Sequence, residues 1–228
     1  MSQAKIASPW RGPKEQQGDR EGKMEAVLRA AAQTFTEKGY YATSMDDVAA
    51  RLKVTKPTLY HYFKNKEEIL YQCVRLGLSV LQASVNEIVG AEGPAIDKLR
   101  AAILKYAEAT FTDFGAWAVR AGEEPLSQKR RLELRKVERH IDDCFRQLIA
   151  AGIDEGQLVP CDPRMVISAI AGTLNWITRW YRPNGELKPA QIAEQVYAIV
   201  IDGLRVRELS IAASSPARKA RAKAASAT

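Results

Sequence analysis

The chain has 228 residues, 46% of them hydrophobic, and a formal net charge of +7. This length and apolar content exclude a chain that is disordered throughout, and they suffice for one sizeable domain or a small module joined to a larger one. The longest charge-free apolar stretch, about residues 165–177, is shorter than the roughly 20 residues of a membrane span. The N-terminus has no apolar signal segment, so we expect a cytoplasmic protein without membrane contact.

The chemistry-bearing residues favour no catalytic or metal site. Cys73, Cys144 and Cys161 are widely spaced without a CxxC pair, which predicts reduced thiols rather than disulfides or a zinc ribbon. GxSxG, P-loop, HExxH and GxGxxG motifs are all missing from the sequence. We therefore expect neither an enzyme nor a cofactor nor a metal, and we place His140 on a charged surface.

Positive charge is concentrated in the N-terminal third and in the tail from Arg218 to Lys223, while the middle is slightly acidic. Such a distribution is typical of a protein whose two ends approach a polyanion. Two kinds of DNA-binding protein fit this pattern: a sequence-specific regulator, and a protein that coats DNA without preference. Salt dependence and the specificity ratio would separate them.

The N-terminal part predicts a flexible basic arm over residues 1–20, followed by short helices. An apolar stripe with helical spacing runs through Met24, Val27, Leu28, Ala31 and Phe35, and a helix with this stripe would stop at Lys38-Gly39.

Three helix starts follow in quick succession. Ser44 and Asp47 have the spacing of a capping box before a helix over residues 45–52. Thr55 is a second N-cap, with Pro57 in the first turn of a helix from Lys56 to about Phe63. Asn65 with Glu68 would cap a long amphipathic helix of about 22 residues, roughly 33 Å in length.

Beyond residue 90 the pattern predicts helices at about 95–112, 113–121, 127–151, 163–181 and 189–209, and no strand. The expected fold class is therefore all-α. We divide the chain into a DNA-binding domain (21–66), a ligand-binding and dimerisation domain (67–211) and a disordered basic tail (212–228).

The two short helices around residue 53 predict a helix-turn-helix, in which the second helix enters the major groove of DNA. Leu59 and Phe63 would face inward. The neighbouring residues that could contact base edges or phosphates are Thr43, Ser44, Thr55, Lys56, Pro57, Thr58, Tyr60, His61, Tyr62, Lys64 and Lys66.

Residues 24–70 resemble the DNA-binding domain of the TetR/AcrR regulators, through Ala31–Tyr40, Thr43–Ala49 and Val54–Glu68. Lys53 departs from the family, which usually has Gly in this turn; a left-handed conformation there would cost a non-glycine residue roughly 1 kcal/mol. The resemblance implies a bacterial repressor, associated with the nucleoid when bound to a palindromic double-stranded operator. It also implies a small-molecule effector and a homodimer formed by the last two long helices.

Residues 174–189 resemble a helix of family members that control fatty-acid, steroid or aromatic-acid breakdown and respond to acyl-CoA thioesters. A different hydrophobic ligand or drug is the alternative effector. The residues that could line its pocket are Leu104, Phe111, Phe114, Trp117, Phe145, Leu148, Ile170, Leu174, Trp176, Arg179 and Trp180. Packing in a bundle or dimer core competes with ligand binding for each of the apolar ones, Trp176 and Trp180 above all.

Overall fold

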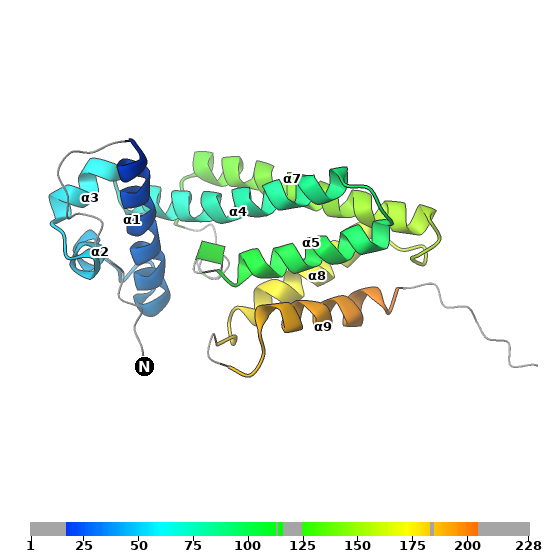
Figure 1. Ribbon diagram of the computed structural model, residues 1–228. Helices are drawn as coiled ribbons and strands as arrows, with labels where there is room; N and C mark the ends of the chain where they lie inside the picture. Colours follow the sequence, from blue (N-terminus) through cyan, green and yellow to red (C-terminus); the bar gives the residue numbers. More distant parts are fainter. Residues whose placement is uncertain (1–16, 113, 116–124, 183–184, 205–228) are drawn as a thin grey trace, which may run out of the picture.

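The computed structural model describes residues 17–112, 114–115, 125–182 and 185–204. Within these ranges the chain forms helices and no β-strand, which confirms the all-α fold class (Figure 1). The helices are α1 (Gln17–Lys38), α2 (Met45–Leu52), α3 (Lys56–Tyr62), α4 (Lys66–Gly90), α5 (Ala95–Thr110), α7 (Gln128–Asp154), α8 (Pro163–Ile177) and α9 (Pro189–Ile201).

Helices α1, α2 and α3 form a small N-terminal domain around the beginning of α4 (Figure 1). The apolar positions of the predicted stripes are its core: Val27, Phe35 and Val48 are at most 2% exposed. Leu59 and Phe63 of the α3 region are equally buried, as their spacing of four residues predicted. The first three helices are therefore held as a unit by one apolar cluster.

Helix α1 is longer than the sequence pattern indicated. It begins at Gln17, ahead of the first stripe residue Met24, so part of the predicted arm is helical. Glutamate, lysine and arginine favour helix even where few apolar side chains are buried. Further along α1, Arg29 and Glu25, four residues apart in sequence, form an ion pair at 2.8 Å. An apolar stripe thus gives only the buried part of such a helix.

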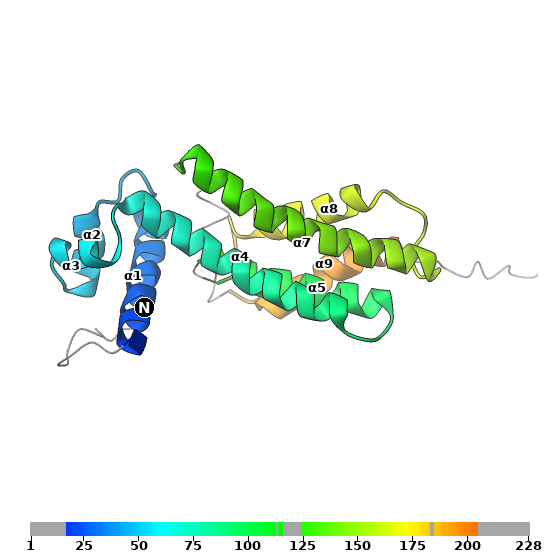
Figure 2. The same ribbon diagram turned by 90° about the horizontal axis from the view of Figure 1, so that it is seen from above.

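Helix α4 links the small domain to a larger helical domain. It has 25 residues, so it is about 37 Å long at 1.5 Å per residue. Figure 2 shows it leaving the N-terminal domain and running beside α5 and α7, both of which it contacts. Helices α8 and α9 pack on each other and on α5 and α7 to complete the domain.

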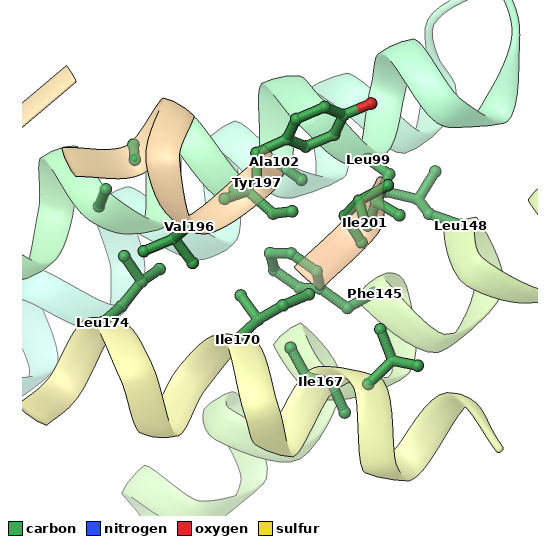
Figure 3. Packing of buried hydrophobic residues seen from close by; sticks show 14 of the residues in the cluster. Leu99, Ala102, Phe145, Leu148, Ile167, Ile170, Leu174, Val196, Tyr197 and Ile201 are labelled. Atoms are coloured by element: carbon green, nitrogen blue, oxygen red, sulfur yellow. The ribbon is translucent and has the colours of Figure 1, made fainter. Parts of the chain in front are cut away.

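The core of the larger domain is formed mainly by side chains of α5, α7, α8 and α9 (Figure 3), with Leu81 and Val85 of α4. Leu99, Phe145 and Ile170 have no exposed surface there. Figure 3 shows Phe145 between the side chains of α8 and those of α9. This cluster is separate from the core of the N-terminal domain.

The ends of α7, α8 and α9 differ from the prediction. Helix α8 ends at Ile177 rather than near residue 181. The next residue, the buried Thr178, donates its hydroxyl to the carbonyl of Asn175 at 2.7 Å, and such a side-chain bond competes with the backbone bonds that would continue the helix. Helix α7 runs on to Asp154, beyond the predicted 151. Helix α9 ends at Ile201, where residues 202–204 form a turn, rather than near the predicted residue 209. Most of the predicted helix at 113–121, the rest of the N-terminal arm and the basic tail lie outside the described residues.

In the part of the chain that the structure describes, the helices are too short or too polar to span a membrane.

Candidate nucleic-acid interface and interhelical cavity

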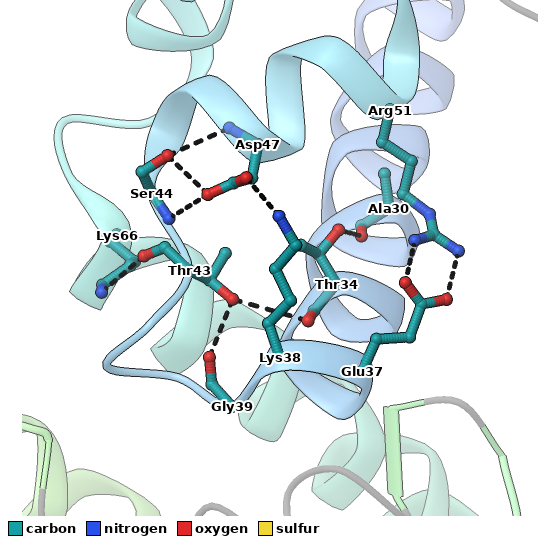
Figure 4. Close-up of polar contacts among 10 residues, drawn as sticks. All are labelled: Ala30, Thr34, Glu37, Lys38, Gly39, Thr43, Ser44, Asp47, Arg51 and Lys66. Carbon is teal, nitrogen blue, oxygen red and sulfur yellow. Dashed lines mark hydrogen bonds and ion pairs between the residues drawn. The ribbon is translucent and has the colours of Figure 1, made fainter.

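The start of α2 is fixed by the predicted capping box. The amide of Asp47 donates to Ser44 Oγ at 3.1 Å, and the amide of Ser44 donates to Asp47 Oδ2 at 2.8 Å (Figure 4). Lys38 also pairs with Asp47, and this ammonium, together with Ser44, holds the pKa of the carboxyl well below its usual range. Helix α2 is thus anchored to the last turn of α1 by its first turn.

The turn between α2 and α3 passes through Lys53 in the left-handed conformation, with φ of 58°. This is the conformation for which the family usually uses Gly, and among the described non-glycine residues only Lys53 has a positive φ. The amide of Val54 closes the turn on the carbonyl of Ala49 at 3.0 Å. Lys53 therefore preserves the geometry of the turn at the cost of some backbone strain.

Helix α3 presents its N-terminal half to solvent. Lys56, Pro57 and Tyr60 are exposed, and so are Thr55 and His61, whereas Thr58 and Tyr62 are partly covered. The N-cap Thr55 makes no side-chain bond to the helix amides; its hydroxyl lies 2.9 Å from that of Thr58. A short exposed helix that begins with hydroxyl, cationic and aromatic side chains can reach base edges and phosphates.

Lys56 has a protein partner. Its ammonium lies 2.7 Å from Asp46 Oδ2 in the first turn of α2, and this carboxylate raises the pKa of Lys56. Both side chains are largely exposed, so the pair can be opened by a competing anion.

Thr43 and Lys66 were predicted to contact DNA, but in the structure their polar groups bond the protein. Thr43 is 2% exposed and donates its hydroxyl to Gly39 O at 2.8 Å. Lys66 donates to the carbonyls of Tyr40 and Thr43 at 2.8 and 2.7 Å, and burial lowers its pKa (Figure 4 shows the bond to Thr43). They brace the turn between α1 and α2, because its carbonyls need donors when α4 packs beside them.

Tyr41 is an exposed aromatic residue that the sequence reasoning missed. It is 72% exposed on the same turn, whereas its neighbour Tyr40 packs on Phe35 with ring centroids 5.3 Å apart. The pair of adjacent tyrosines was the available signal, since only one of them can face the core. Ser44 and Lys64 are also exposed near the ends of α2 and α3.

A cavity of about 390 Å³ lies among α4, α5 and α7, with one contribution from α8. Its walls are mainly apolar. The described residues that line it are Val74, Gly77, Leu78, Leu81, Tyr106, Ala109, Thr110, Gly115, Leu126, Leu134, Glu138, Ile141, Asp142 and Asn175. A cavity of this size with few polar groups is typical of a small-molecule site.

The polar groups of the cavity come from α5, α7 and α8. Tyr106 donates its hydroxyl to Asn175 Oδ1 at 3.4 Å, and burial raises the pKa of Tyr106 to about 12. Burial also raises the pKa of Asp142, which is partly covered. Sequence reasoning missed these residues, although Glu138 and Asp142 flank the inward stripe of α7 that contains Leu134 and Ile141.

The predicted ligand-contacting residues that the structure describes do not line this cavity. Phe145, Leu148, Ile170 and Leu174 are core residues of the larger domain, so packing accounts for them (Figure 3). Leu104 and Phe111 pack against that core, and Phe114 against the core of the N-terminal domain. Trp176 and Trp180 are 62% and 52% exposed, Arg179 is stacked over Trp176, and Trp117 lies outside the described residues.

One wall of the cavity also belongs to the N-terminal domain. Val74 of α4, Leu134 of α7 and Leu126 just before α7 line the cavity and are part of the same apolar cluster as Phe35, Val48 and the other core residues of α1–α3. The two domains thus meet at side chains that a bound molecule would touch.

Polar contacts join the same two helices. Glu67 in the first turn of α4 accepts a bond from the backbone amide of Ser127, the N-cap of α7, at 2.9 Å, and Arg130 lies 3.3 Å from the same oxygen. The Ser127 amide, with Arg130 contributing, lowers the pKa of Glu67. One turn further on, the hydroxyl of Tyr71 donates to Glu133 at 2.8 Å. The beginning of α7 is therefore fastened to the beginning of α4.

Comparisons with known proteins match both parts of the chain. Residues 27–73 match the family model of bacterial regulatory proteins of the tetR family, and residues 92–204 match the tetracyclin repressor-like C-terminal domain. Together these matches cover the DNA-binding domain and the larger domain described above.

Individual relatives of this chain are also transcriptional regulators. The HTH-type transcriptional repressor KstR2 of Mycobacterium tuberculosis is 29% identical over 182 residues, which are 78% of this chain and 90% of that protein. The solved structure of KstR2, a ketosteroid transcriptional regulator, is 28% identical, with a TM-score of 0.75 over 81% of this chain and 96% of that one. The TetR-family regulator PfmR from Thermus thermophilus is 30% identical, with a TM-score of 0.72 over 79% of this chain and 99% of that one. The chain therefore belongs to the TetR family of bacterial transcriptional regulators.

Proposed function

We propose that this protein is a homodimeric transcriptional repressor that binds a palindromic operator with α3 of each subunit and leaves it when a small hydrophobic effector occupies the cavity among α4, α5 and α7. In the simplest case the two α3 helices lie about 34 to 36 Å apart, one turn of the duplex. An effector weakens binding only if it prefers a conformation in which this separation is wrong.

The shared cavity wall is the observation that carries the proposal. Val74, Leu126 and Leu134 touch the cavity on one side and pack with the DNA-binding core on the other. A ligand that displaces them acts on α4 and the beginning of α7, which Glu67 and Ser127 join. Close-packed side chains transmit such a displacement because the interior has little free volume.

For the effector we propose an acyl-CoA thioester. The likeness to KstR2, a ketosteroid regulator, supports it, as does the fatty acid metabolism regulator protein of Bacillus subtilis, 23% identical over 195 residues. The apolar walls of the cavity suit an acyl chain. A different hydrophobic metabolite or drug is the second candidate, because those walls alone do not single out an acyl group.

The DNA-binding part is tested by selecting operator sequences from a random duplex pool with the purified protein. Replacing Lys56 and Tyr60 together by Ala should weaken binding to the selected operator at least about tenfold, since both side chains face outward from α3. Lys105→Ala on α5 removes the same charge from a distant exposed site and should leave operator affinity unchanged. Unaltered binding by the double variant, or equal affinity for all sequences, would refute the assignment.

The effector is tested by titrating acyl-CoA thioesters of increasing chain length into the operator complex and following release by fluorescence anisotropy. Release by at least one thioester below millimolar concentration is expected. Release only by an unrelated drug or metabolite would refute the acyl-CoA assignment and leave the repressor assignment standing.

A further inference from the structure

Three polar side chains meet where α4 and α7 pack together: Asn86 of α4, and His140 and Cys144 of α7. The imidazole Nε2 lies 2.7 Å from the amide Oδ1 and 3.8 Å from the thiol Sγ, and the thiol lies 3.7 Å from the same amide oxygen. Asn86 and His140 are exposed, whereas Cys144 is 5% exposed. The group is therefore reached from solvent through its imidazole and its amide.

This group is separate from the cavity among α4, α5 and α7. The described residues that line the cavity include Ile141 and Asp142 of α7, but not the three residues of the group. Helix α7 thus turns one face to the cavity and another to Asn86. With the imidazole proton on Nε2, imidazole and thiol both donate to the one amide oxygen, so two protons converge on a single acceptor.

The three atoms have the spacing of a set of metal ligands. A circle through Nε2, Oδ1 and Sγ has a radius of about 2.0 Å, because the sides of their triangle are 2.7, 3.7 and 3.8 Å long. Zinc bonds are about 2.0 to 2.2 Å long to imidazole nitrogen and to oxygen, and about 2.3 Å to thiolate sulfur. A cation slightly outside the plane of the triangle would therefore reach all three atoms and keep a position for water.

The donor types indicate which cations fit. Thiolate and imidazole suit borderline and soft cations such as Zn²⁺ and Cd²⁺, whereas Mg²⁺ and Ca²⁺ prefer oxygen ligands. In the part of the chain that the structure describes, no three His, Cys, Asp or Glu side chains gather as metal ligands, so an amide oxygen completes this set. His140 and Cys144 are four residues apart on one face of α7, but Asn86 comes from another helix, which sequence spacing does not reveal.

We infer that Asn86, His140 and Cys144 form a binding site for a thiophilic divalent cation such as Zn²⁺ or Cd²⁺, which ties α4 to α7. On binding, the thiol loses its proton to solvent and the thiolate bonds the cation. The imidazole bonds through the lone pair of Nε2 and keeps its proton on Nδ1. Burial raises the pKa of the Cys144 thiol, so without a cation the sulfur remains a neutral thiol rather than a reactive nucleophile.

The site is tested by titrating the DNA-free protein with Cd²⁺ and following the ultraviolet absorption of the cadmium–thiolate bond. We expect the absorption to saturate at one cation per chain and to be reversed by excess Zn²⁺. Cys144→Ser should abolish it, whereas Cys161→Ser, the same change at a cysteine that is partly exposed elsewhere, should leave it unchanged. His140→Gln should weaken Cd²⁺ binding at least about tenfold, because glutamine can bond Asn86 but lacks the imidazole nitrogen.

Asn86→Asp provides a variant that should gain affinity. A carboxylate oxygen in place of the amide oxygen should tighten Cd²⁺ binding at least about fivefold, because it adds a negative charge next to the cation. Ser79→Asp is the matched control: it places the same charge at an exposed position two turns earlier on α4 and should change the affinity less than about twofold. A gain in affinity is not produced by partial unfolding, so this comparison does not depend on the stability of a variant.

Absence of the absorption in the wild type at millimolar Cd²⁺ would overturn the inference, and so would its persistence in Cys144→Ser. Unchanged affinity in His140→Gln, or an equal gain in Ser79→Asp and Asn86→Asp, would also overturn it. Operator affinity and effector release do not enter these measurements, so a failure of the proposed function would leave the cation site standing.

Discussion

Asp46 and Lys56 show how single charges on the DNA-binding face compete. The ion pair between them, 2.7 Å long, joins the first turns of α2 and α3 and occupies the Lys56 ammonium, which we propose contacts DNA. To contact a phosphate or a base, Lys56 has to leave Asp46. We therefore expect the carboxylate to lower the affinity for every DNA sequence alike.

Asp46→Asn is expected to tighten binding to non-operator DNA about two- to fivefold at low salt, because an exposed ion pair is weak but the free ammonium then gains a phosphate. The measurement is a salt series of anisotropy titrations with a random duplex, in which the variant should show the steeper slope. Asp97→Asn, an exposed carboxylate on α5, makes the same change in net charge and should have no effect. Weaker binding by Asp46→Asn would contradict this account.

At this face, the conformations that depend on neighbouring residues in sequence could be predicted. The burial and hydrogen bonds that depend on how the helices pack could not. The capping box of Ser44 and Asp47 and the left-handed Lys53 follow from spacing and from the missing glycine. The burial of Thr43 and the bonds from Lys66 to carbonyls depend on how α4 packs against the turn between α1 and α2, which no short stretch of sequence contains.

Among the elements, α4 and α7 carry the connection between the domains. Glu67 of α4 works as a capping group for α7, because its carboxylate accepts the amide of Ser127 at the positive end of that helix. The sequence pattern indicated both helices, yet the cap is supplied by a residue 60 positions away. Such long-range caps leave no signature in local spacing.

Glu67→Gln should lower the free energy of unfolding by about 1 kcal/mol at neutral pH. Because the pKa of Glu67 is lowered from 4.5 on folding, its contribution is present above that value and is lost as the pH falls through the folded-state pKa. The stability difference between wild type and variant should therefore shrink below about pH 4.5, as urea unfolding at several pH values can check. Glu108→Gln, on an exposed pair of α5, is the control. A difference that is independent of pH would argue against the cap.

On the scale of the whole molecule, α8 and α9 carry large apolar side chains that are exposed. Met165 and Trp176 of α8 are 68% and 62% exposed, and Ile199 of α9 is 78% exposed. Single exposed apolar residues are ordinary, but several on the last two helices fit the proposed dimer interface. Trp176 then belongs to the contact between subunits rather than to a ligand site.

Ile199→Glu should convert the dimer to a monomer at micromolar concentration, because a charge placed at the centre of an apolar contact is costly to bury. Sedimentation equilibrium measures this directly, and operator affinity should fall with the loss of the second α3. Leu132→Glu is a matched control, because Leu132 is 49% exposed on α7. A dimer that survives Ile199→Glu would place the interface elsewhere.

The domain plan and the DNA-binding helices could be predicted at this scale, but the lining of the cavity could not. Periodicity identifies residues that are buried, such as Phe145 and Ile170, and says nothing about whether they face a void or another side chain. Whether a buried side chain faces a cavity depends on how α4, α5 and α7 pack against one another. The cavity is therefore lined by residues such as Tyr106 and Asn175, which the apolar pattern passes over.

Val74, Leu126 and Leu134 belong both to the cavity wall and to the apolar core of the DNA-binding domain. A change in the range of ligands that the cavity accepts should therefore also change the affinity for DNA. Shortening one of these side chains would admit a bulkier molecule and would at the same time remove apolar packing from the DNA-binding domain. Adaptation to a new effector should therefore begin at Tyr106, Asp142 and Asn175, the part of the wall that lies outside the DNA-binding core.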